Sequence, residues 1–263
     1  MFGNAEAYDR FMGRWSRLIA PPLLDFASLP EVGQVLDVGS GIGDLAFEVA
    51  RRKIGLHVRG VDRSHEFVAY ATSQNPCPER IRFQVGDAQD LPFADGVCAA
   101  ALSSLVFNFI PDPAKALREL CRATQPGSRI SAAVWDYGER MFMLRAFWDA
   151  AVETDPSAER LDEKHMPLCR AGELSELWRQ SGLEDVQEQP LEVTMKFDSF
   201  MDYWDPFLLG QGPAGAYVRT LDGNRVQILR SAVKRRLSTS SESDAFVLPA
   251  RVWAVQGRTP LHS

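Results

Sequence analysis

Three glycines spaced two residues apart follow a short apolar run, and aspartates accompany them. The run Val35–Val38 has the β-branched, apolar character of a buried parallel strand, whereas the residues from Asp44 onward have the spacing of a helix. Gly39, Gly41 and Gly43 lie between the two, where glycine can take a positive φ and lets a ligand approach the backbone at the helix N-terminus. The turn therefore predicts a site for a nucleotide-like ligand.

The glycine turn alone fits two classes of ligand. Gly41-Ile-Gly43-Asp-Leu-Ala46 also matches the dinucleotide pattern Gly-x-Gly-x-x-Ala. Asp62, 19 residues after Gly43, ends a second expected strand, and its carboxylate could accept from both ribose hydroxyls in either class. Three features separate the classes: Asp37 within the first strand, Gly86-Asp87-Ala88 after a third strand, and Leu91-Pro92-Phe93 beyond it.

In these residues the chain resembles class I methyltransferases that use S-adenosylmethionine, over about residues 30–135. Asp37–Gly43 carries the resemblance together with Asp62 and Asp87. The stretches Leu102–Arg118 and Gln125–Arg129 are similar to the ubiquinone/menaquinone-biosynthesis type (methyltransferase type 11), which includes many small-molecule enzymes. The resemblance implies a Rossmann-like α/β sandwich: a seven-stranded, mostly parallel sheet with an antiparallel last strand, an N-terminal helix and a helical insertion or cap.

The resemblance also implies the cofactor S-adenosyl-L-methionine, with S-adenosyl-L-homocysteine as product. Asp62 would hold the ribose hydroxyls, and Asp87 would accept from the adenine N6 amine while the Ala88 amide donates to the ring. Arg14 is our candidate partner for the methionine carboxylate, with Arg17 as the alternate. The expected cofactor-binding residues are Tyr8, Arg14, Asp37, Gly39, Ser40, Gly41, Gly43, Asp62, Arg63, Asp87, Ala88, Ser103 and Ser104.

Two other functions stay open from the sequence. An NAD-type oxidoreductase would share the sheet topology, although Asp44 at the helix start would repel a pyrophosphate. A methyltransferase-like protein could also have kept the fold as a non-catalytic binding subunit. The intact set of acids and glycines argues against loss of the cofactor site.

Methyl transfer from a sulfonium is an in-line displacement with a neutral leaving group, so positioning can supply most of the rate, about 7–11 kcal/mol. A base is needed only for a protonated acceptor, and no catalytic residue is firmly assigned. The two candidates for a base are His165 and Asp136. His165 lies in a segment that could fold over the site, and an exposed turn carboxylate is the simpler interpretation of Asp136.

Aromatic residues outside the glycine turn suggest an apolar or aromatic acceptor if they face the site, and only core packing if they do not. The candidates for acceptor contact are Trp15, Asn108, Trp135, Tyr137, Tyr203 and Trp204. We expect a small organic acceptor methylated on O, N or C, whose identity the sequence does not give.

Charge and cysteine content narrow the class of partner. The net charge is −6, which argues against nucleic acid because phosphate binding needs a basic surface. The four cysteines are widely spaced and no histidine cluster accompanies them, so neither a metal site nor a disulfide framework is expected. We expect a cytoplasmic protein without membrane insertion, and leave monomer or homodimer undecided.

Strands and helices alternate through the region of the resemblance, which favours right-handed crossovers and a parallel sheet. The expected strands are Val35–Val38, Leu56–Val61, Ile81–Val85, Cys98–Leu102 and Arg129–Trp135, with helices at Asp44–Arg52, His65–Ser73 and Pro113–Thr124. A helix before them is expected to stop at Pro21 and Pro22.

The expected organisation is a single methyltransferase domain, 1–263. Its parts are an N-terminal helical cap (1–29), a cofactor-binding core (30–135), a helical insertion or lid (137–182), and C-terminal strands with acceptor-side helices (183–263). A polar loop is expected at Ser238–Asp244.

Overall fold

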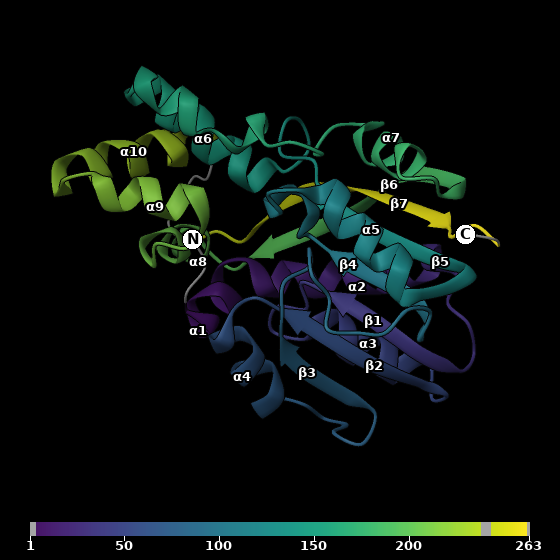
Figure 1. Ribbon diagram of the computed structural model, residues 1–263. Coiled ribbons are helices and arrows are strands. Elements are labelled where there is room, and N and C mark those ends of the chain that lie inside the picture. The colour runs from purple at the N-terminus through teal and green to yellow at the C-terminus, as the bar shows by residue number, and fades with distance from the viewer. Residues whose placement is uncertain (1–3, 238–242, 262–263) are drawn as a thin grey trace. The chain divides into compact units, whose positions relative to one another are not determined.

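The computed structural model describes residues 4–237 and 243–261, and a mixed sheet of seven strands runs through it (Figure 1). The strand order is β3-β2-β1-β4-β5-β7-β6, with β7 antiparallel and helices on both faces. The strands are β1 (Gly33–Val38), β2 (Leu56–Asp62), β3 (Ile81–Val85), β4 (Cys98–Ser104), β5 (Thr124–Trp135), β6 (Glu184–Phe197) and β7 (Phe246–Arg258). The expected Rossmann-like fold class is confirmed.

The helices alternate with the first five strands as expected, and further helices follow β5. The α-helices are α1 (Ala5–Tyr8), α2 (Arg14–Ala27), α3 (Asp44–Arg52), α4 (His65–Ser73), α5 (Pro113–Ala123), α6 (Phe142–Thr154), α7 (Glu173–Gln180), α8 (Phe200–Leu208), α9 (Gly212–Thr220) and α10 (Gly223–Arg236). A π-helix, Asp9–Gly13, joins α1 to α2, and short 3-10 helices lie at Phe107–Phe109, Pro156–Leu161 and Glu163–His165. Most of the expected loop Ser238–Asp244, residues 238–242, lies outside the described residues.

The chain divides into two compact units. The second unit holds Trp15–Val134, Pro167–Leu191 and the chain from Val252 on, and the first holds the rest. In the second unit β1 pairs in parallel with β2 and β4, so that Asp37 faces Gly60 on one side and Leu102 on the other. Apolar side chains of these strands are buried, and α3 and α4 pack on β2 and β3.

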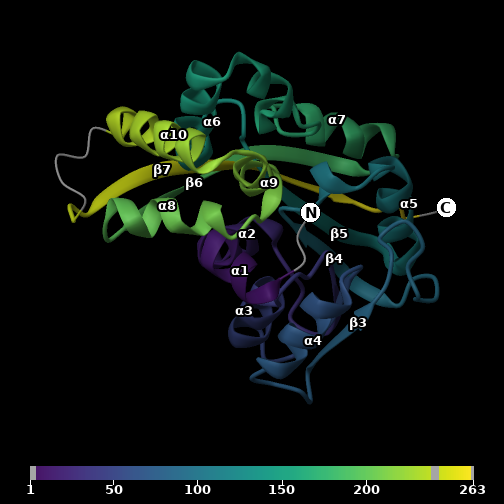
Figure 2. The same ribbon diagram turned by 90° about the vertical axis from the view of Figure 1, so that its left-hand side faces the viewer.

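The first unit is largely helical. Helices α6, α9 and α10 pack together, as Figure 2 shows. The ring of Phe147 stacks on Phe207 with centroids 4.6 Å apart, and Tyr203 donates a hydrogen bond to the Met143 carbonyl. Buried aromatic side chains thus form the core of this unit.

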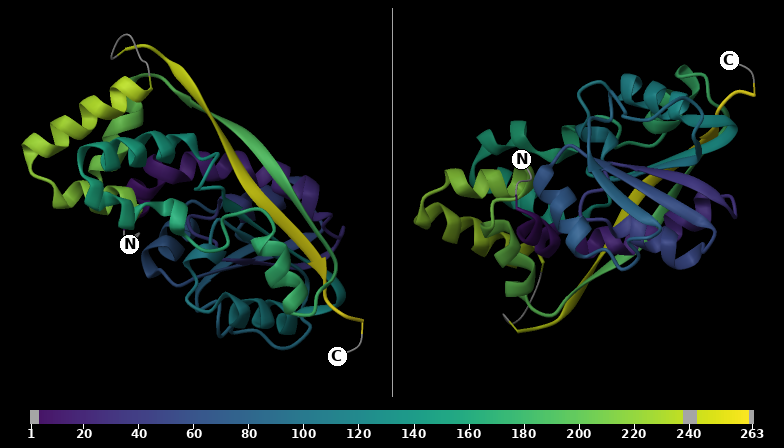
Figure 3. Two further views of the ribbon diagram at one scale, coloured as in Figure 1. Left: turned by 90° about the horizontal axis from the view of Figure 1, so that it is seen from above. Right: turned by 60° about the horizontal axis from the view of Figure 1, so that its bottom comes forward.

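Strands β6 and β7 run side by side (Figure 3), and each contains residues of both units. Each strand is long, with 14 residues in β6 and 13 in β7, which exceeds the usual strand of 5–6 residues. The change of unit falls inside each strand, after Leu191 in β6 and after Arg251 in β7. The two units therefore share a continuous piece of sheet backbone.

The expectation that the first helix stops at Pro21 and Pro22 is wrong, because α2 contains both and continues to Ala27. Neither proline can donate a hydrogen bond to the preceding turn, a loss of about 3 kcal/mol for each interior proline. Leu23 and Leu24 are buried in the next turn. Burial of such side chains, about 1.5–3 kcal/mol each, offsets that loss.

Strand β5 begins at Thr124 and not at the expected Arg129, so it includes Pro126 and Gly127. The pairing of β4 with β5 shifts register between Cys98 and Ala100, which accommodates the irregular start. Gly127 has φ of 74° and donates to the Thr259 carbonyl. The helix α5 nevertheless ends within one residue of its expected end.

Candidate functional site

The glycine turn lies at the carboxyl end of β1, where the chain order of the sheet reverses. From β1 the sheet extends to β2 on one side and to β4 on the other, which makes this the topological switch point where open α/β sheets bind ligands. The Gly39 and Ser40 amides both donate to the Val61 carbonyl, at 2.7 and 3.0 Å. The turn is thus fixed to the neighbouring strand.

The three glycines have different reasons to be glycine. All have positive φ: 72° at Gly39, 52° at Gly41 and 97° at Gly43. A Cβ on Gly39 would lie 2.4 Å from the Val106 side chain, and one on Gly43 would lie 2.6 Å from Phe47. A Cβ on Gly41 would meet nothing closer than a carbonyl oxygen at 4.0 Å. Protein atoms leave the space in front of Gly41 open, as a ligand would require.

Asp62 ends β2 and is bonded directly to the glycine turn. One carboxylate oxygen accepts from the Gly41 amide at 2.9 Å, and the other accepts from the Ser64 amide at 2.8 Å. Burial raises the pKa of this carboxyl, and the two amides oppose that rise. Each oxygen keeps further lone-pair capacity, so the group can still accept hydrogen bonds from a diol.

Asp37 lies inside β1 and is buried, with 1% of its surface exposed. Burial and the nearby Asp62 carboxylate raise its pKa to about 7. Its Oδ2 atom and the Ser40 hydroxyl are buried and form no hydrogen bond with the described residues. Buried polar atoms usually have hydrogen-bond partners. These two atoms therefore indicate a place where a bound ligand or a water molecule would form hydrogen bonds.

Asp87, two residues after β3, is exposed. Its carboxylate accepts from the Gln89 amide at 2.8 Å, which is the main reason for its lowered pKa. The exposed Arg63 also lowers the pKa of both Asp87 and Asp62 through its charge. The three side chains thus form one electrostatic group beyond the ends of β2 and β3.

The end of β4 contributes Ser103 and Ser104. The buried Ser103 hydroxyl donates to the Val38 carbonyl at 2.8 Å, so it ties β4 to β1 and is occupied structurally. Ser104 is half-buried at the last position of the strand. Trp15 and Asn108 of the same unit are both buried.

Residues 36–132 match a family model described as a methyltransferase domain. The chain is 35% identical over 133 residues to a malonyl-[acyl-carrier protein] O-methyltransferase of Pectobacterium atrosepticum, covering 50% of each chain. It is 32% identical over 125 residues to a 2-methyl-6-phytyl-1,4-hydroquinone methyltransferase of Synechocystis sp., covering 48% of this chain and 39% of that protein. This chain holds a class I methyltransferase domain.

A solved structure has the same fold over nearly the whole chain, including the methyltransferase domain. It is phosphoethanolamine N-methyltransferase 2 of Haemonchus contortus, in complex with phosphomonomethylethanolamine and S-adenosylhomocysteine. The TM-score is 0.59 at 17% identity, over 97% of this chain and 57% of that one. The chain spans half or less of the length of the two curated relatives, so the likeness to them concerns the methyltransferase domain.

Two expected cofactor residues, Tyr8 and Arg14, belong to the other unit. Tyr8 ends α1 next to the π-helix, a kind of helix that is frequent at functional sites. Arg14 donates to Asp202 at 2.7 Å and lies over the Phe197 ring at 5.1 Å. Its assignment to the methionine carboxylate stays a prediction, and Asp202 would compete for the same guanidinium.

The alternate, Arg17, lies in the unit of the methyltransferase domain. Its guanidinium is 3.3 Å from the carboxylate of Asp44, at the start of α3. Asp44 directly follows the glycine turn in sequence, and Arg17 balances the charge of this acid, which was expected to repel a pyrophosphate. Arg17 is half exposed, so the pair is a weak restraint.

Four expected acceptor residues of the first unit are buried: Trp135, Tyr137, Tyr203 and Trp204. Tyr203 is fully occupied, since its hydroxyl donates to a backbone carbonyl at 2.7 Å and its ring packs on Phe207. Trp204 packs on Phe200 and Phe207. These contacts favour a core role for Tyr203 and Trp204, while Trp135 keeps a buried indole nitrogen without a partner among the described residues.

The two candidate bases differ in surroundings. The expectation that Asp136 is an exposed turn carboxylate is wrong, because only 3% of its surface is exposed. Two guanidinium nitrogens of Arg251 donate to one of its oxygens, and the Glu139 amide donates to the other. Such an ion pair holds Asp136 as a structural carboxylate. His165 is exposed, with its Nε2 3.2 Å from the Glu159 carboxylate.

No pattern in the sequence singles out Asp202, Gln211 or Arg219. Asp202 is identified only from the structure, through its hydrogen bond with Arg14, 188 residues away. Gln211 and Arg219 line a cavity next to a glycine-rich turn, Leu209-Gly210-Gln211-Gly212. That turn is the one signal that could have drawn attention to them.

Within the described residues, no helix has the length and apolar character needed to cross a membrane. The same part of the chain holds no group of three His, Cys, Asp or Glu side chains that could bind a metal ion.

Proposed function

We propose that this chain transfers a methyl group from S-adenosylmethionine to a small organic molecule. The observation that carries the proposal is the hydrogen bond from the Gly41 amide to the Asp62 carboxylate, together with the open space at the Cβ position of Gly41. A methyltransferase family model covers these residues, and a neighbour of the same fold was solved with S-adenosylhomocysteine. The donor set therefore suits an adenosine with a free ribose diol.

Each residue of the set has a proposed part in holding the donor. Asp62 accepts hydrogen bonds from the ribose hydroxyls with the lone pairs that its two backbone donors leave. Asp87 accepts from the adenine amine while the Ala88 amide donates to the ring. The unpartnered Oδ2 of Asp37 and hydroxyl of Ser40 mark the place of a polar group near the glycine turn.

S-adenosylmethionine supplies an electrophilic methyl group on its sulfonium sulfur. The sulfur leaves as a neutral thioether, so the departure needs no acid. The chain's own contribution is then to bind, to align and to exclude water, and alignment alone can supply about 7–11 kcal/mol. Both oxygens of the buried Asp136 carboxylate already accept hydrogen bonds, from Arg251 and from the Glu139 amide. We therefore propose positioning as the main source of rate, with no obligatory base.

The acceptor is proposed only as a class. The printed names of the relatives include a hydroquinone and a malonyl-[acyl-carrier protein], which differ in size, charge and methylated atom. The proposed donor residues Asp62 and Asp87 lie within residues 36–132, which the methyltransferase family model matches, whereas Tyr203 and Trp204 lie outside them. Methylation of O, N or C is compatible with the proposal.

Calorimetric titration of the full chain with S-adenosylhomocysteine and, separately, with NADH tests the donor assignment. We expect binding of the first and none of the second, and tight binding of NADH alone would overturn the proposal in favour of an oxidoreductase. Replacing Asp62 with alanine should weaken S-adenosylhomocysteine binding by about 1–3 kcal/mol, because charge-assisted hydrogen bonds are lost.

The matched control is Glu184→Ala, which removes an exposed carboxylate of the same unit away from the turn. Its affinity should equal that of the unchanged chain. An Asp62→Ala protein with unaltered affinity would show that the donor does not lie at this carboxylate. Turnover is then sought by incubating the chain with labelled donor and cell extract and searching for metabolites that gain the labelled methyl group.

A further inference from the structure

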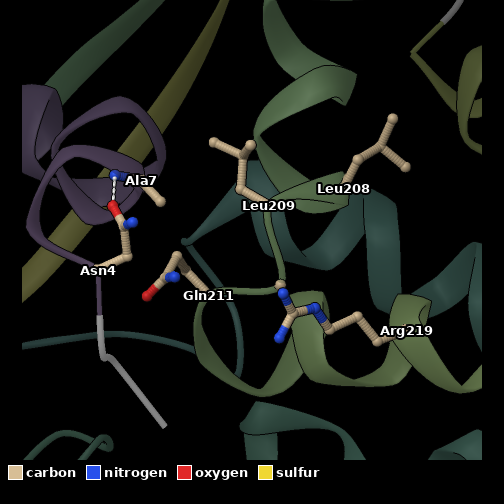
Figure 4. A pocket seen from close by; sticks show the side chains of 7 residues that line it. Asn4, Ala7, Leu208, Leu209, Gln211 and Arg219 are labelled. Atoms are coloured by element: carbon tan, nitrogen blue, oxygen red, sulfur yellow. Dashed lines mark hydrogen bonds between the residues drawn. The ribbon is translucent and has the colours of Figure 1, made fainter.

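A cavity of about 600 Å³ lies in the first unit, at the turn between α8 and α9 (Figure 4). Its lining comes from the start of α1 and from the α8–α9 region, all within one unit. The lining residues are Asn4, Ala7, Leu208, Leu209, Gly210, Gln211 and Arg219. None of them belongs to the glycine turn or to the acids of the proposed donor site.

Gln211 has a buried polar atom that the described residues leave unsatisfied. The residue is 6% exposed, and its Oε1 has no hydrogen-bond partner there. It is the N-cap residue of α9, yet its side chain caps no helix amide. A buried carbonyl oxygen without a hydrogen-bond donor is unfavourable, because it has lost its contact with water. A hydroxyl or amino donor on a bound molecule would relieve it.

Arg219 supplies the charge of the cavity. The described residues give its guanidinium neither an ion pair nor a hydrogen bond, and no acidic side chain lines the cavity. Its side chain lies across Gly210, since a Cβ there would be 2.2 Å from Arg219 Nε. Gly210 has φ of 74°, so the backbone conformation favours glycine there.

Two further features favour an anion with an apolar body. The cavity lies at the N-terminus of α9, where helix dipoles favour negative charge. Leu208, Leu209 and Ala7 add apolar surface, and Leu208 is 46% exposed. The cavity is thus positive and partly apolar, although the net charge of the chain is −6.

We propose that this cavity binds a small organic acid that carries a hydroxyl or amino group near its carboxylate. Arg219 pairs with the carboxylate, Gln211 Oε1 accepts from the hydroxyl or amino group, and the leucines contact the apolar body. The site goes beyond the proposed methyl transfer and does not depend on it, because binding is measured without the donor.

Three probes that differ by one group each test the proposal: 3-phenyllactate, 3-phenylpropanoate without the hydroxyl, and 2-phenylethanol without the carboxylate. Binding to the full chain is measured by saturation-transfer NMR and by calorimetry. We expect 3-phenyllactate to bind most tightly and 2-phenylethanol most weakly. Equal binding of the three, or none by any, would overturn the proposal.

Arg219→Gln should weaken 3-phenyllactate binding about tenfold or more, since a charge-assisted pair is worth about 1.5–3 kcal/mol. Arg225→Gln is the matched control, because it removes an exposed arginine of α10 that lines no part of the cavity. Equal weakening by both variants would reduce the effect to overall charge and contradict an arginine site.

Gln211→Leu separates binding from structure. It should remove the preference for 3-phenyllactate over 3-phenylpropanoate while leaving the melting temperature unchanged or higher, because an unsatisfied buried oxygen is lost. A preserved preference would exclude Gln211 from the site. Methylation of a bound probe in the presence of labelled donor would identify the probe as a methyl acceptor. Binding without methylation would identify it as a separate ligand. Both outcomes support the binding site.

Discussion

Asp37 and Glu163 are buried acids, one in each unit, and burial raises the pKa of each to about 7. A carboxyl with a higher pKa in the folded than in the unfolded chain binds more protons when folded. Stability is therefore unaffected by this group below about pH 4, falls as pH rises through the interval up to about 7, and stays reduced above it. The two acids should make the protein less stable at pH 8 than at pH 5.

Asp37→Asn tests this pH dependence for the donor site. The amide can still accept the hydrogen bond from Ala46 that favours the present carboxylate, but it cannot ionise. Thermal unfolding followed at pH 5 to 8 should show a smaller loss of stability with pH than in the unchanged chain, by on the order of a few kcal/mol. Asp185→Asn, an exposed carboxyl of the same unit, should leave the profile as it is. An undiminished slope in Asp37→Asn would mean that Asp37 is ionised in the folded protein throughout this range.

The glycines and aspartates proposed to hold the donor could be singled out from the sequence because they lie close together along the chain or at the ends of successive parallel strands. Asp62 meets the Gly41 amide for that reason. The surroundings of Arg14 and Asp136 could not be predicted in this way. Their partners, Asp202 and Arg251, are more than a hundred residues distant, and no local pattern reports such contacts.

Among the helices and strands, the periodic helices were the most predictable. The bounds of α3 and α4 agree with the expectation, because apolar spacing and flanking residues mark both ends. The first helix was expected to end too early, since the rule that proline ends a helix takes no account of the burial available beyond it. Leu23 and Leu24 lie past the prolines and are buried.

Pro21→Ala should stabilise the protein by about 1–3 kcal/mol. The new amide can donate to the carbonyl four residues earlier, and this gain exceeds the about 0.4–1 kcal/mol lost because the unfolded chain becomes more flexible. Denaturant unfolding measures the change. Pro111→Ala, in an exposed loop position, carries only the unfolded-state effect and should be slightly destabilising. Destabilisation by Pro21→Ala would show that the packing of the proline ring matters more than the missing hydrogen bond.

The alternation of strands and helices predicted the parallel half of the sheet, since right-handed crossovers leave few possible topologies. The first unit could not be predicted in the same way. It combines the start of the chain, residues 135–166 and residues 192–251, and only tertiary packing joins these segments. The aromatic residues expected at an acceptor site illustrate this limit. Their helical spacing is the same whether they line a pocket or pack in a core, so the sequence pattern does not distinguish the two roles.

The shared strands lead to a prediction about cooperativity. Because the boundary between units falls inside β6 and β7, neither unit can unfold without breaking part of the hydrogen-bonded ladder that continues into the other. We therefore expect the two units to unfold in one transition, so that a ligand of one unit protects both. S-adenosylhomocysteine at 100 times its Kd should stabilise the fold by about 2.7 kcal/mol.

Hydrogen exchange under conditions that report equilibrium opening measures this directly. Amides of β1 in the second unit and of α6 in the first should gain the same protection on addition of S-adenosylhomocysteine, although Asp62 and Asp87 lie in the second unit and, of the proposed cofactor residues, only Tyr8 and Arg14 lie in the first. The Asp62→Ala protein, exposed to the same ligand concentration, should lose the added protection in both places together. Added protection confined to β1 would mean that the first unit opens independently, and that continuity of β6 and β7 is too weak a link to couple the two.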